Sequence, residues 1–372
     1  MRHWVMDYET LANCFTGVFE HYKTQETEIF VIHDLQNDLP KFISFLQENI
    51  NNKEWHISYN GLAFDAQVTH YILDNYFLWK DLEGCEVAAI IYKYAQRCIT
   101  KSNNKEFSDY PAWKMKMGQI DIFKMHHWDN AAKRSSLKWI QYSMDWQNII
   151  DMPIHHETLI HTQAEIDTIL EYCVNDVKST KEIYNRSHSQ VKLRKELTKE
   201  YDINLYSASE PRISKEIFGY FLTKKLGIPK RDLKQMRTYR ETIKVSDIIL
   251  PYISFTSLEF NVLLDRFKSL EVNAYNLKGS FKYAIEYKNV KTHFGLGGVH
   301  GAANKGVYEP DDDMMIMSSD VTSFYPNLAI KNQWSPGHFP KEEFCDQYEW
   351  FFEERKKIPK SNPMNYVYKI IL

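Results

Sequence analysis

The sequence predicts a mixed α/β (α+β) fold whose strands are concentrated near the start of the chain. Three short stretches, 3–7, 14–22 and 28–33, are rich in β-branched and aromatic residues and are separated by polar turns, a pattern typical of strands. Apolar residues then recur at helical spacing over 39–50. Strands followed by helices indicate a layered domain, which we expect to end near residue 200.

The next segments continue this alternation. Residues 55–59 and 119–124 are typical of strands, and residues 64–76 and 83–98 are typical of helices. The clearest helical pattern runs from Gln163 to about residue 202. Its apolar positions repeat at i, i+3 and i+4 spacing: Ile166, Ile169, Leu170, Cys173, Val174 and Val177.

Composition limits the class of protein. The 372 residues are enough for two or three domains, and a net charge of −3 excludes a small, uniformly basic nucleic-acid-binding protein. The longest apolar run, 87–92, is far too short to span a membrane. The five cysteines form no C-x-x-C pair, so neither a zinc ribbon nor a disulfide framework is expected. We therefore expect a cytoplasmic protein (in the host cytoplasm if it is viral) that makes no membrane contact.

One segment departs from this charge balance. Residues 224–244 contain eight Lys or Arg against Asp232 and Glu241, a local charge of +6. A solvated helix face explains such a run as well as a surface that contacts the phosphates of a nucleic acid.

Two carboxylates stand two residues apart at the end of the first expected strand. Asp7 and Glu9 would face the same side of that strand and repel each other unless a divalent cation lies between them. An isolated D-x-E is weak evidence, because chance gives about one in a chain of this length.

Two further patterns follow in order along the chain. Asn60, Phe64 and Asp65 follow the strand 55–59 and place a carboxylate at the start of a helix, where Asp is also an ordinary cap. Tyr172 and Asp176 are four residues apart on the long helix and share one face, as an ordinary neighbour pair also would. Together the four carboxylates can bind two Mg²⁺ or Mn²⁺ ions, which would activate a water for phosphodiester hydrolysis, with Tyr172 orienting that water.

This pattern resembles the DEDD-type proofreading 3′–5′ exonuclease that has a tyrosine in its third motif. The resemblance covers residues 1 to about 200 and implies a ribonuclease H-like sheet flanked by helices. It assigns catalysis to Asp7, Glu9, Asp65, Tyr172 and Asp176, with the four carboxylates as metal ligands. It also implies that Asn60 and Phe64 contact the single-stranded 3′ end, the aromatic ring stacking on a base.

A second constellation begins at Asp320, after the apolar run 314–317, which we expect to be a strand. Asp320, Ser323, Tyr325 and Pro326 resemble motif A of the family B DNA polymerases. The resemblance makes Asp320 a catalytic metal ligand. It implies that Tyr325 stacks under the incoming sugar and excludes a 2′-hydroxyl.

Weaker matches flank motif A. Gly297, Gly298 and His300 resemble the glycine motif that contacts template DNA in this family, although a tight turn explains them equally well. Arg355, at the end of an expected helix, and Lys369, in what resembles the start of motif B, would bind the incoming nucleotide. A solvated basic face is the alternative for both.

The resemblance as a whole implies a phage-like family B DNA polymerase in three parts. These are an exonuclease domain (1–200), a connecting, DNA-contacting region (201–295) and a partial palm with short fingers (296–372). Its partners would be primer–template and single-stranded DNA and deoxynucleoside triphosphates. The rest of motif B and the motif with the second palm aspartate do not occur before Leu372. We therefore expect DNA synthesis to require a C-terminal polymerase fragment or the rest of the chain.

Two alternatives remain at this stage. A free-standing 3′–5′ nuclease acting on RNA or DNA would carry the same exonuclease motifs. A non-catalytic nucleic-acid-binding subunit would keep the basic segment 224–244 and the abundant aromatic residues, but would not cut.

Overall fold

The computed structural model describes the chain except for residues 1–2, 133, 274, 276–280 and 296–297. By its internal contacts the chain forms two compact units. The first unit contains residues 1–221 and 351–372, and the second contains residues 222–350. The three parts expected from the sequence, with boundaries at residues 200 and 295, are functional regions rather than units defined by contacts. That organisation stays a prediction.

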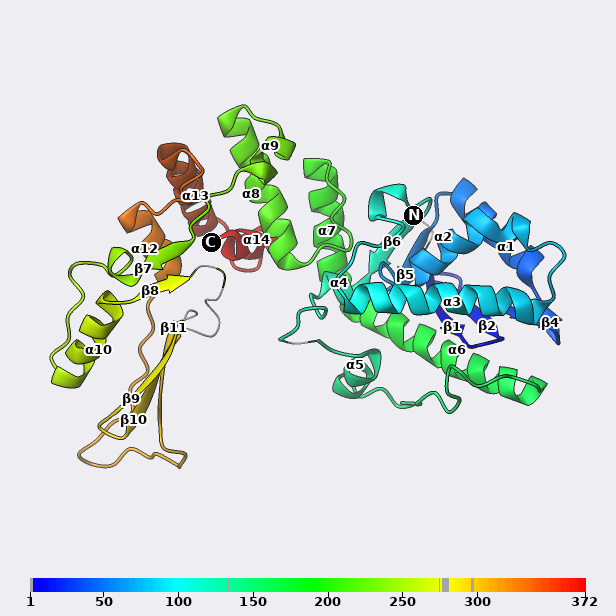
Figure 1. Ribbon diagram of the computed structural model, residues 1–372, viewed down its shortest axis with the longest axis horizontal. Helices are drawn as coiled ribbons and strands as arrows, with labels where there is room; N and C mark the ends of the chain where they lie inside the picture. Colours follow the sequence, from blue (N-terminus) through cyan, green and yellow to red (C-terminus); the bar gives the residue numbers. More distant parts are fainter. Residues whose placement is uncertain (1–2, 133, 274, 276–280, 296–297) are drawn as a thin grey trace. The chain divides into compact units, whose positions relative to one another are not determined.

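A mixed sheet organises the first unit (Figure 1), so the predicted α/β class is confirmed. Its strand order is β4-β3-β2-β1-β5-β6. The neighbours from β4 to β1 pair antiparallel, whereas β1 pairs parallel with β5, and β5 with β6. The strands are β1 (His3–Thr10), β2 (Phe15–His21), β3 (Thr27–His33), β4 (Gln36–Asn37), β5 (Trp55–Ser58) and β6 (Gly118–Asp121).

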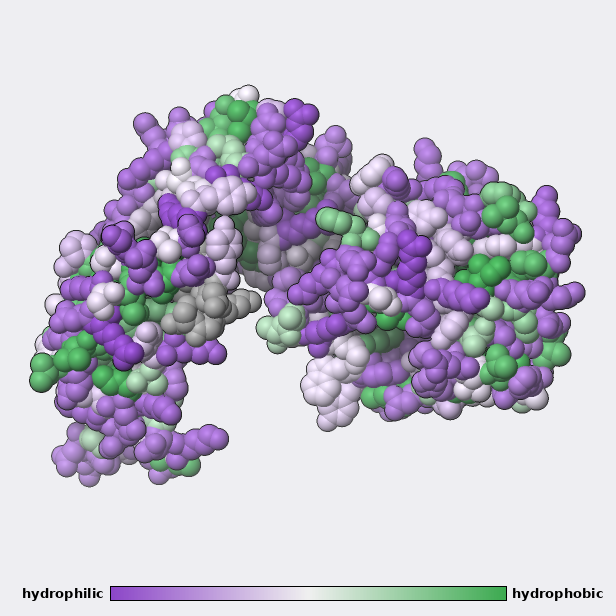
Figure 2. All heavy atoms as spheres, viewed as in Figure 1, coloured by the Kyte–Doolittle hydropathy of each residue, from purple (hydrophilic) through white to green (hydrophobic). Residues whose placement is uncertain are grey.

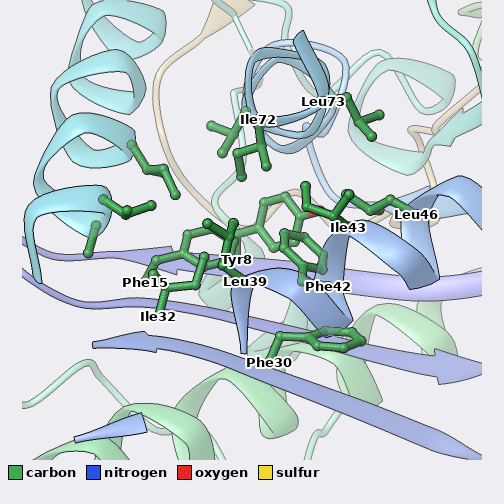
Figure 3. Close-up of a cluster of buried hydrophobic side chains, with 14 of the residues drawn as sticks. Tyr8, Phe15, Phe30, Ile32, Leu39, Phe42, Ile43, Leu46, Ile72 and Leu73 are labelled. Atoms are coloured by element: carbon green, nitrogen blue, oxygen red, sulfur yellow. The ribbon is translucent and has the colours of Figure 1, made fainter. Parts of the chain in front are cut away.

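Helices cover both faces of this sheet because residues of β1 alternate between two cores. Trp4, Met6 and Tyr8 pack with three helices in a cluster rich in phenylalanine (Figure 3). Those helices are α1 (Leu39–Asn51), α2 (Asp65–Asn75) and α3 (Gly84–Asn103). On the opposite face, Val5 packs with residues of α6 (Gln163–Arg186). The odd-numbered residues of β1 therefore face α6.

The long helix expected over 163–202 is two helices. Helix α6 ends at Arg186, and α7 (His188–Tyr201) begins after Ser187. The Ser187 hydroxyl donates to the Ile183 carbonyl at 2.7 Å and lies 2.7 Å from His126 Nε2. A serine that bonds back to the preceding turn bends a helix, whereas the apolar pattern continues across the break. The sequence pattern therefore did not reveal the break between α6 and α7.

The remaining elements of the first unit connect or extend these layers. They are η1 (Tyr76–Leu78), η2 (Ala112–Lys114), α4 (Ile122–Met125), α5 (Leu137–Ser143), most of α8 (Glu210–Leu226), the end of α13 (Lys341–Lys357) and α14 (Pro363–Ile371). Leu197 of α7, Ile217 of α8, Phe351 of α13 and Val367 of α14 share one buried cluster. The last 22 residues thus complete a core that begins near residue 193.

The second unit has two small sheets, one ordered β11-β10-β9 and one pairing β7 with β8. Its elements are α9 (Lys230–Gln235), β7 (Thr242–Lys244), η3 (Val245–Asp247), α10 (Leu258–Lys268), β8 (Glu271–Asn273), β9 (Lys282–Tyr287), β10 (Val290–Gly295), β11 (Gly298–Ala303) and α12 (Phe324–Asn332). The predicted strand at 314–317 is wrong, because these residues are irregular and exposed. Within the described part of the chain no strand pairs with this apolar run, so its backbone has no ladder to join.

Hydrophilic residues dominate the face of the molecule drawn in Figure 2. None of the helices in the described residues is both long enough and apolar enough to cross a membrane.

A buried arginine joins three parts of the first unit, and its removal tests that role. Arg194 is 1% exposed and donates to the carbonyls of Met125, Gln190 and Ala208. We expect Arg194→Met to lower the free energy of unfolding by about 3 kcal/mol, because the buried carbonyls of Met125 and Ala208 and the half-buried one of Gln190 lose this donor. Urea unfolding measures the change. Arg186→Met, which removes an exposed pair with Glu182, should cost less than about 0.5 kcal/mol. Equal losses in the two variants would contradict this role for Arg194.

Candidate active site

The parallel pairing of β1 with β5 brings three of the expected carboxylates to one edge of the sheet. The register aligns Val5 with Ile57, so both strands run toward the same edge. Asp7 and Glu9 lie near the end of β1 on the face toward α6. Asp65 is the first residue of α2, in the segment that follows β5.

Helix α6 supplies the other two expected residues. Asp176 and Tyr172 share one face of this helix, which packs on β1, β2 and β5. Asp65 and Asp176 are 2% and 4% exposed, and Asp7 and Glu9 are half-buried. The structure therefore brings together the four carboxylates and the tyrosine that the sequence pattern singled out.

The electrostatics show how close these groups are. Burial raises the pKa of Asp7 well above its usual range, and the charges of Asp65, Glu9 and Asp176 raise it further. Burial and the charges of Asp176 and Asp65 raise the pKa of Glu9 to about 8. Burial, with a contribution from Asp121, raises the pKa of Asp65 to about 7. Carboxylates that oppose each other's ionisation in this way need a cation to share the site as anions.

An unsatisfied oxygen indicates where a metal ion would bind. Asp65 Oδ1 is buried and has no hydrogen-bond partner among the described residues. A buried carboxylate oxygen without a donor is costly, and coordination of a cation would satisfy it. Carboxylate oxygens are the ligands that Mg²⁺ and Mn²⁺ prefer, so this set of residues fits the two ions that the sequence pattern implied.

Asp176 has protein partners that sequence reasoning missed. Its Oδ1 accepts hydrogen bonds from Lys138 Nζ at 2.7 Å and from Gln141 Nε2 at 2.9 Å, both on α5. The Lys138 ammonium also lies 4.2 Å from the centre of the Tyr172 ring. Lys138 therefore orients both members of the third motif and adds positive charge beside the carboxylates.

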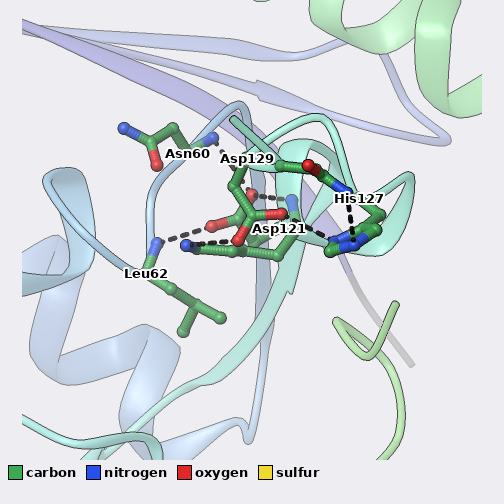
Figure 4. A network of polar contacts seen from close by, with 7 residues as sticks. Asn60, Leu62, Asp121, His127 and Asp129 are labelled. Carbon is green, nitrogen blue, oxygen red and sulfur yellow. Dashed lines mark hydrogen bonds and ion pairs between the residues drawn. The ribbon is translucent and has the colours of Figure 1, made fainter. Parts of the chain in front are cut away.

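Another buried aspartate holds the turn that leads to Asp65. Asp121, fully buried at the end of β6, accepts hydrogen bonds from the backbone N–H groups of Asn60, Leu62 and Lys124 at 3.0–3.1 Å (Figure 4). Asn60 has a φ of 69°, in the left-handed region that Asn tolerates. A Cβ at Gly61 would lie 1.9 Å from Ser58 Oγ, so the turn requires glycine there. The sequence analysis gave Asp121 no role.

The two residues that we expect to contact the single-stranded 3′ end of the DNA lie on this turn. Asn60 and Phe64 are both half-buried, and Phe64 packs against the core cluster of α1, α2 and α3. They flank the turn that Asp121 fixes, directly before Asp65.

A cysteine also belongs to the cluster. Cys173 is fully buried, and its Sγ donates to the Asp7 carbonyl at 3.4 Å. One ligand atom from each of Asp7, Glu9 and Cys173 lies within 4.8 Å of the others. The sequence analysis placed Cys173 in the apolar stripe of the helix. Its position next to Tyr172 was the one feature of the sequence that pointed to a place in the cluster.

The residues of the second constellation are divided between the two units. Asp320 lies on the exposed, irregular segment before α12, and Tyr325 is 70% exposed, both in the second unit. Arg355 of α13 and Lys369 of α14 belong to the first unit.

The glycine motif lies in a hairpin of the second unit. Gly298 has a φ of 140°, which requires glycine, and His300 is exposed on β11 opposite His293. Gly297 lies outside the described residues.

Comparison with known proteins gives a distant likeness to a solved structure. No protein-family model matches the chain, and no curated protein matches it. The chain is similar to the solved structure of the family B DNA polymerase from the hyperthermophilic archaeon Pyrobaculum calidifontis, with a TM-score of 0.42 and 12% sequence identity. The match covers 100% of this chain and 45% of the polymerase, so the chain spans less than half the length of that protein. A likeness at this level decides neither the fold nor the function.

The raised carboxyl pKa values predict how stability depends on pH. Glu9 titrates at about 8 and Asp65 at about 7 in the folded protein, against about 4 in an unfolded chain. Between these values the folded state binds more protons, so the free energy of unfolding of the metal-free protein should fall as the pH rises from about 5 to about 8. Thermal unfolding in EDTA measures this. Glu9→Gln should flatten the dependence, and a slope equal to that of the unsubstituted chain would contradict the assignment.

Asp121 is expected to control metal binding through the turn. Asp121→Asn keeps the size of the side chain but removes one of the two acceptor oxygens that hold the turn. We expect the Mg²⁺ concentration needed for half of the thermal stabilisation to rise by about tenfold, because Asp65 is less firmly placed. His127→Ala is the control, since His127 bonds to Asp129 rather than to the turn. Unchanged Mg²⁺ dependence in Asp121→Asn would refute this role.

Proposed function

We propose that this protein is a metal-dependent 3′–5′ exonuclease that removes nucleotides from the 3′ ends of single-stranded DNA. The observation that carries the proposal is the cluster of Asp7, Glu9, Asp65 and Asp176, in which Asp65 Oδ1 has no partner among the described residues. Tyr172 stands on the same helix face as Asp176. We also propose that the first unit has a ribonuclease H-like fold, which the order β3-β2-β1-β5-β6 and its mixture of antiparallel and parallel pairs support.

Each residue of the cluster has a distinct part in this chemistry. Asp7, Glu9, Asp65 and Asp176 would hold two Mg²⁺ or Mn²⁺ ions, which supply an activated water and stabilise the leaving oxygen of the phosphodiester. Burial and the charges of Asp176, Glu9 and Asp7 raise the pKa of Tyr172, so its hydroxyl keeps its proton and can orient the attacking water. Lys138 fixes Asp176 and offers a positive charge to the scissile phosphate.

The surroundings of the turn between Asn60 and Phe64 are suited to binding single-stranded DNA. Asn60 lines a pocket of about 740 Å³ together with Lys101, Lys105, Lys124 and Arg134. Lys101 and Lys124 pair with Asp109 and Asp129 there, which leaves Lys105 and Arg134 as the cations best placed for phosphates. The half-buried ring of Phe64, one residue after the pocket-lining Ala63, suits a terminal base. We propose that the 3′-terminal nucleotides enter over Asn60 and Phe64 toward Asp7.

We further propose that this activity is the proofreading part of a family B DNA polymerase. Asp320 would bind metal, Tyr325, Arg355 and Lys369 would bind the incoming nucleotide, and segment 224–244 with Gly297, Gly298 and His300 would contact DNA. The motif A residues support this proposal through their sequence pattern. DNA synthesis is not expected from the chain as described, because Asp320 stands on an exposed, irregular segment.

A 5′-labelled primer on a longer template tests the proposal. With Mg²⁺ and all four deoxynucleoside triphosphates, we expect shortening from the 3′ end without extension. Asp7→Ala with Glu9→Ala should reduce shortening by at least about a thousandfold, because the ligands of the ions are lost, while single-strand binding persists. Gel electrophoresis and fluorescence anisotropy measure the two properties.

The control separates the candidate functions. Glu26→Ala changes an exposed turn residue before β3 and should leave shortening unchanged. Binding without turnover in either Mg²⁺ or Mn²⁺ would support a non-catalytic nucleic-acid-binding subunit instead. Faster digestion of a matched RNA strand would favour the free-standing RNA nuclease, and undiminished digestion by the double variant would refute the proposed site.

A further inference from the structure

We propose that the carboxylate cluster also binds thiophilic divalent ions such as Zn²⁺ and Cd²⁺, through the thiol of Cys173 together with Asp7 and Glu9. One ligand atom from each of these three side chains lies within 4.8 Å of the other two. Mg²⁺ does not use sulfur ligands, so Cys173 adds a selectivity that a site made of carboxylates alone does not have.

The position of the thiol supports this role. Cys173 follows Tyr172 on α6 and is fully buried where the helix packs on β1. Its described hydrogen bond is the weak one from Sγ to the Asp7 carbonyl, at 3.4 Å. Burial and the charges of Asp7 and Glu9 raise the pKa of the Cys173 thiol, so a bound cation has to displace its proton.

An independent observation points to a cation at the same place. Asp65 Oδ1 is an acceptor without a partner among the described residues, and the Asp65 side chain is 2% exposed. Of the neighbouring charges, that of Asp65 acts most strongly on Asp7. Carboxylates with one thiolate are a donor set that Zn²⁺ accepts readily, and Asp65, which lies outside the group of three, adds negative charge beside it.

The chemistry of binding is simple exchange. The S–H bond of Cys173 breaks, a metal–sulfur bond forms, and the proton passes to solvent. No electron changes hands. An ion held in this way occupies ligands that the proposed two-ion site needs, so Zn²⁺ and Cd²⁺ should inhibit digestion in competition with Mg²⁺. The inhibition rests on the proposed function, whereas the binding does not.

Cadmium titration of the metal-free 372-residue chain tests the binding directly. Thiolate coordination produces an ultraviolet charge-transfer band, which we expect to grow with one equivalent of Cd²⁺. Cys173→Ser should lose this band. Cys345→Ser is the matched control, because Cys345 is also buried and also directs its Sγ to a backbone carbonyl, that of Trp334. Glu9→Gln should weaken Cd²⁺ binding by about tenfold or more, because a carboxylate ligand is lost.

The outcomes are separable. An undiminished band in Cys173→Ser, or one that is insensitive to Glu9→Gln, would overturn the inference. Cys173→Ala repeats the test, and circular dichroism verifies that each variant is folded. A band that behaves as expected in a chain that digests no DNA would refute the proposed function alone. In an active enzyme, Cys173→Ser should raise the Zn²⁺ concentration for half-inhibition by about tenfold, measured relative to that variant's own Mg²⁺-dependent rate.

Discussion

The parallel pairing of β1 with β5 is the constraint on which the first unit depends. It makes the two strands end at the same edge, so a carboxylate near the end of one meets a carboxylate after the other. The alternation of β1 then separates an aromatic core from a polar site within eight residues. Val5 secures the strand against α6, and Asp7 and Glu9 continue along the same face, next to Asp176.

The site concentrates negative charge that the rest of the fold has to hold in place. Asp65 is fixed through a turn anchored by Asp121, and Asp176 is fixed by Lys138 and Gln141. These partners satisfy some of the carboxylate oxygens and leave Asp65 Oδ1 without a donor among the described residues. Such an arrangement costs stability in the metal-free protein, and under the proposed function it would position the ligands before a cation binds.

The sequence predicted those features of the fold and the site that follow from the spacing of neighbouring residues along one strand or one helix. The two-residue period placed Asp7 and Glu9 on one face, and the four-residue interval did the same for Tyr172 and Asp176. The Lys138–Asp176 pair joins residues 38 positions apart, and no periodic pattern encodes such a contact. The expected strand at 314–317 was wrong because an apolar run becomes a strand only beside a partner, which a sequence pattern does not show.

The return of residues 351–372 to the first unit makes residues 222–350 an insertion rather than a successor domain. The chain leaves within α8 and re-enters within α13, and the cluster of Leu197, Ile217, Phe351 and Val367 is complete only after that return. During synthesis the apolar faces of α7 and α8 are therefore made well before the segment that covers them. Translation therefore separates the two halves of one core in time. The apolar faces of α7 and α8 stay uncovered in the nascent chain until residues 351–372 have been made.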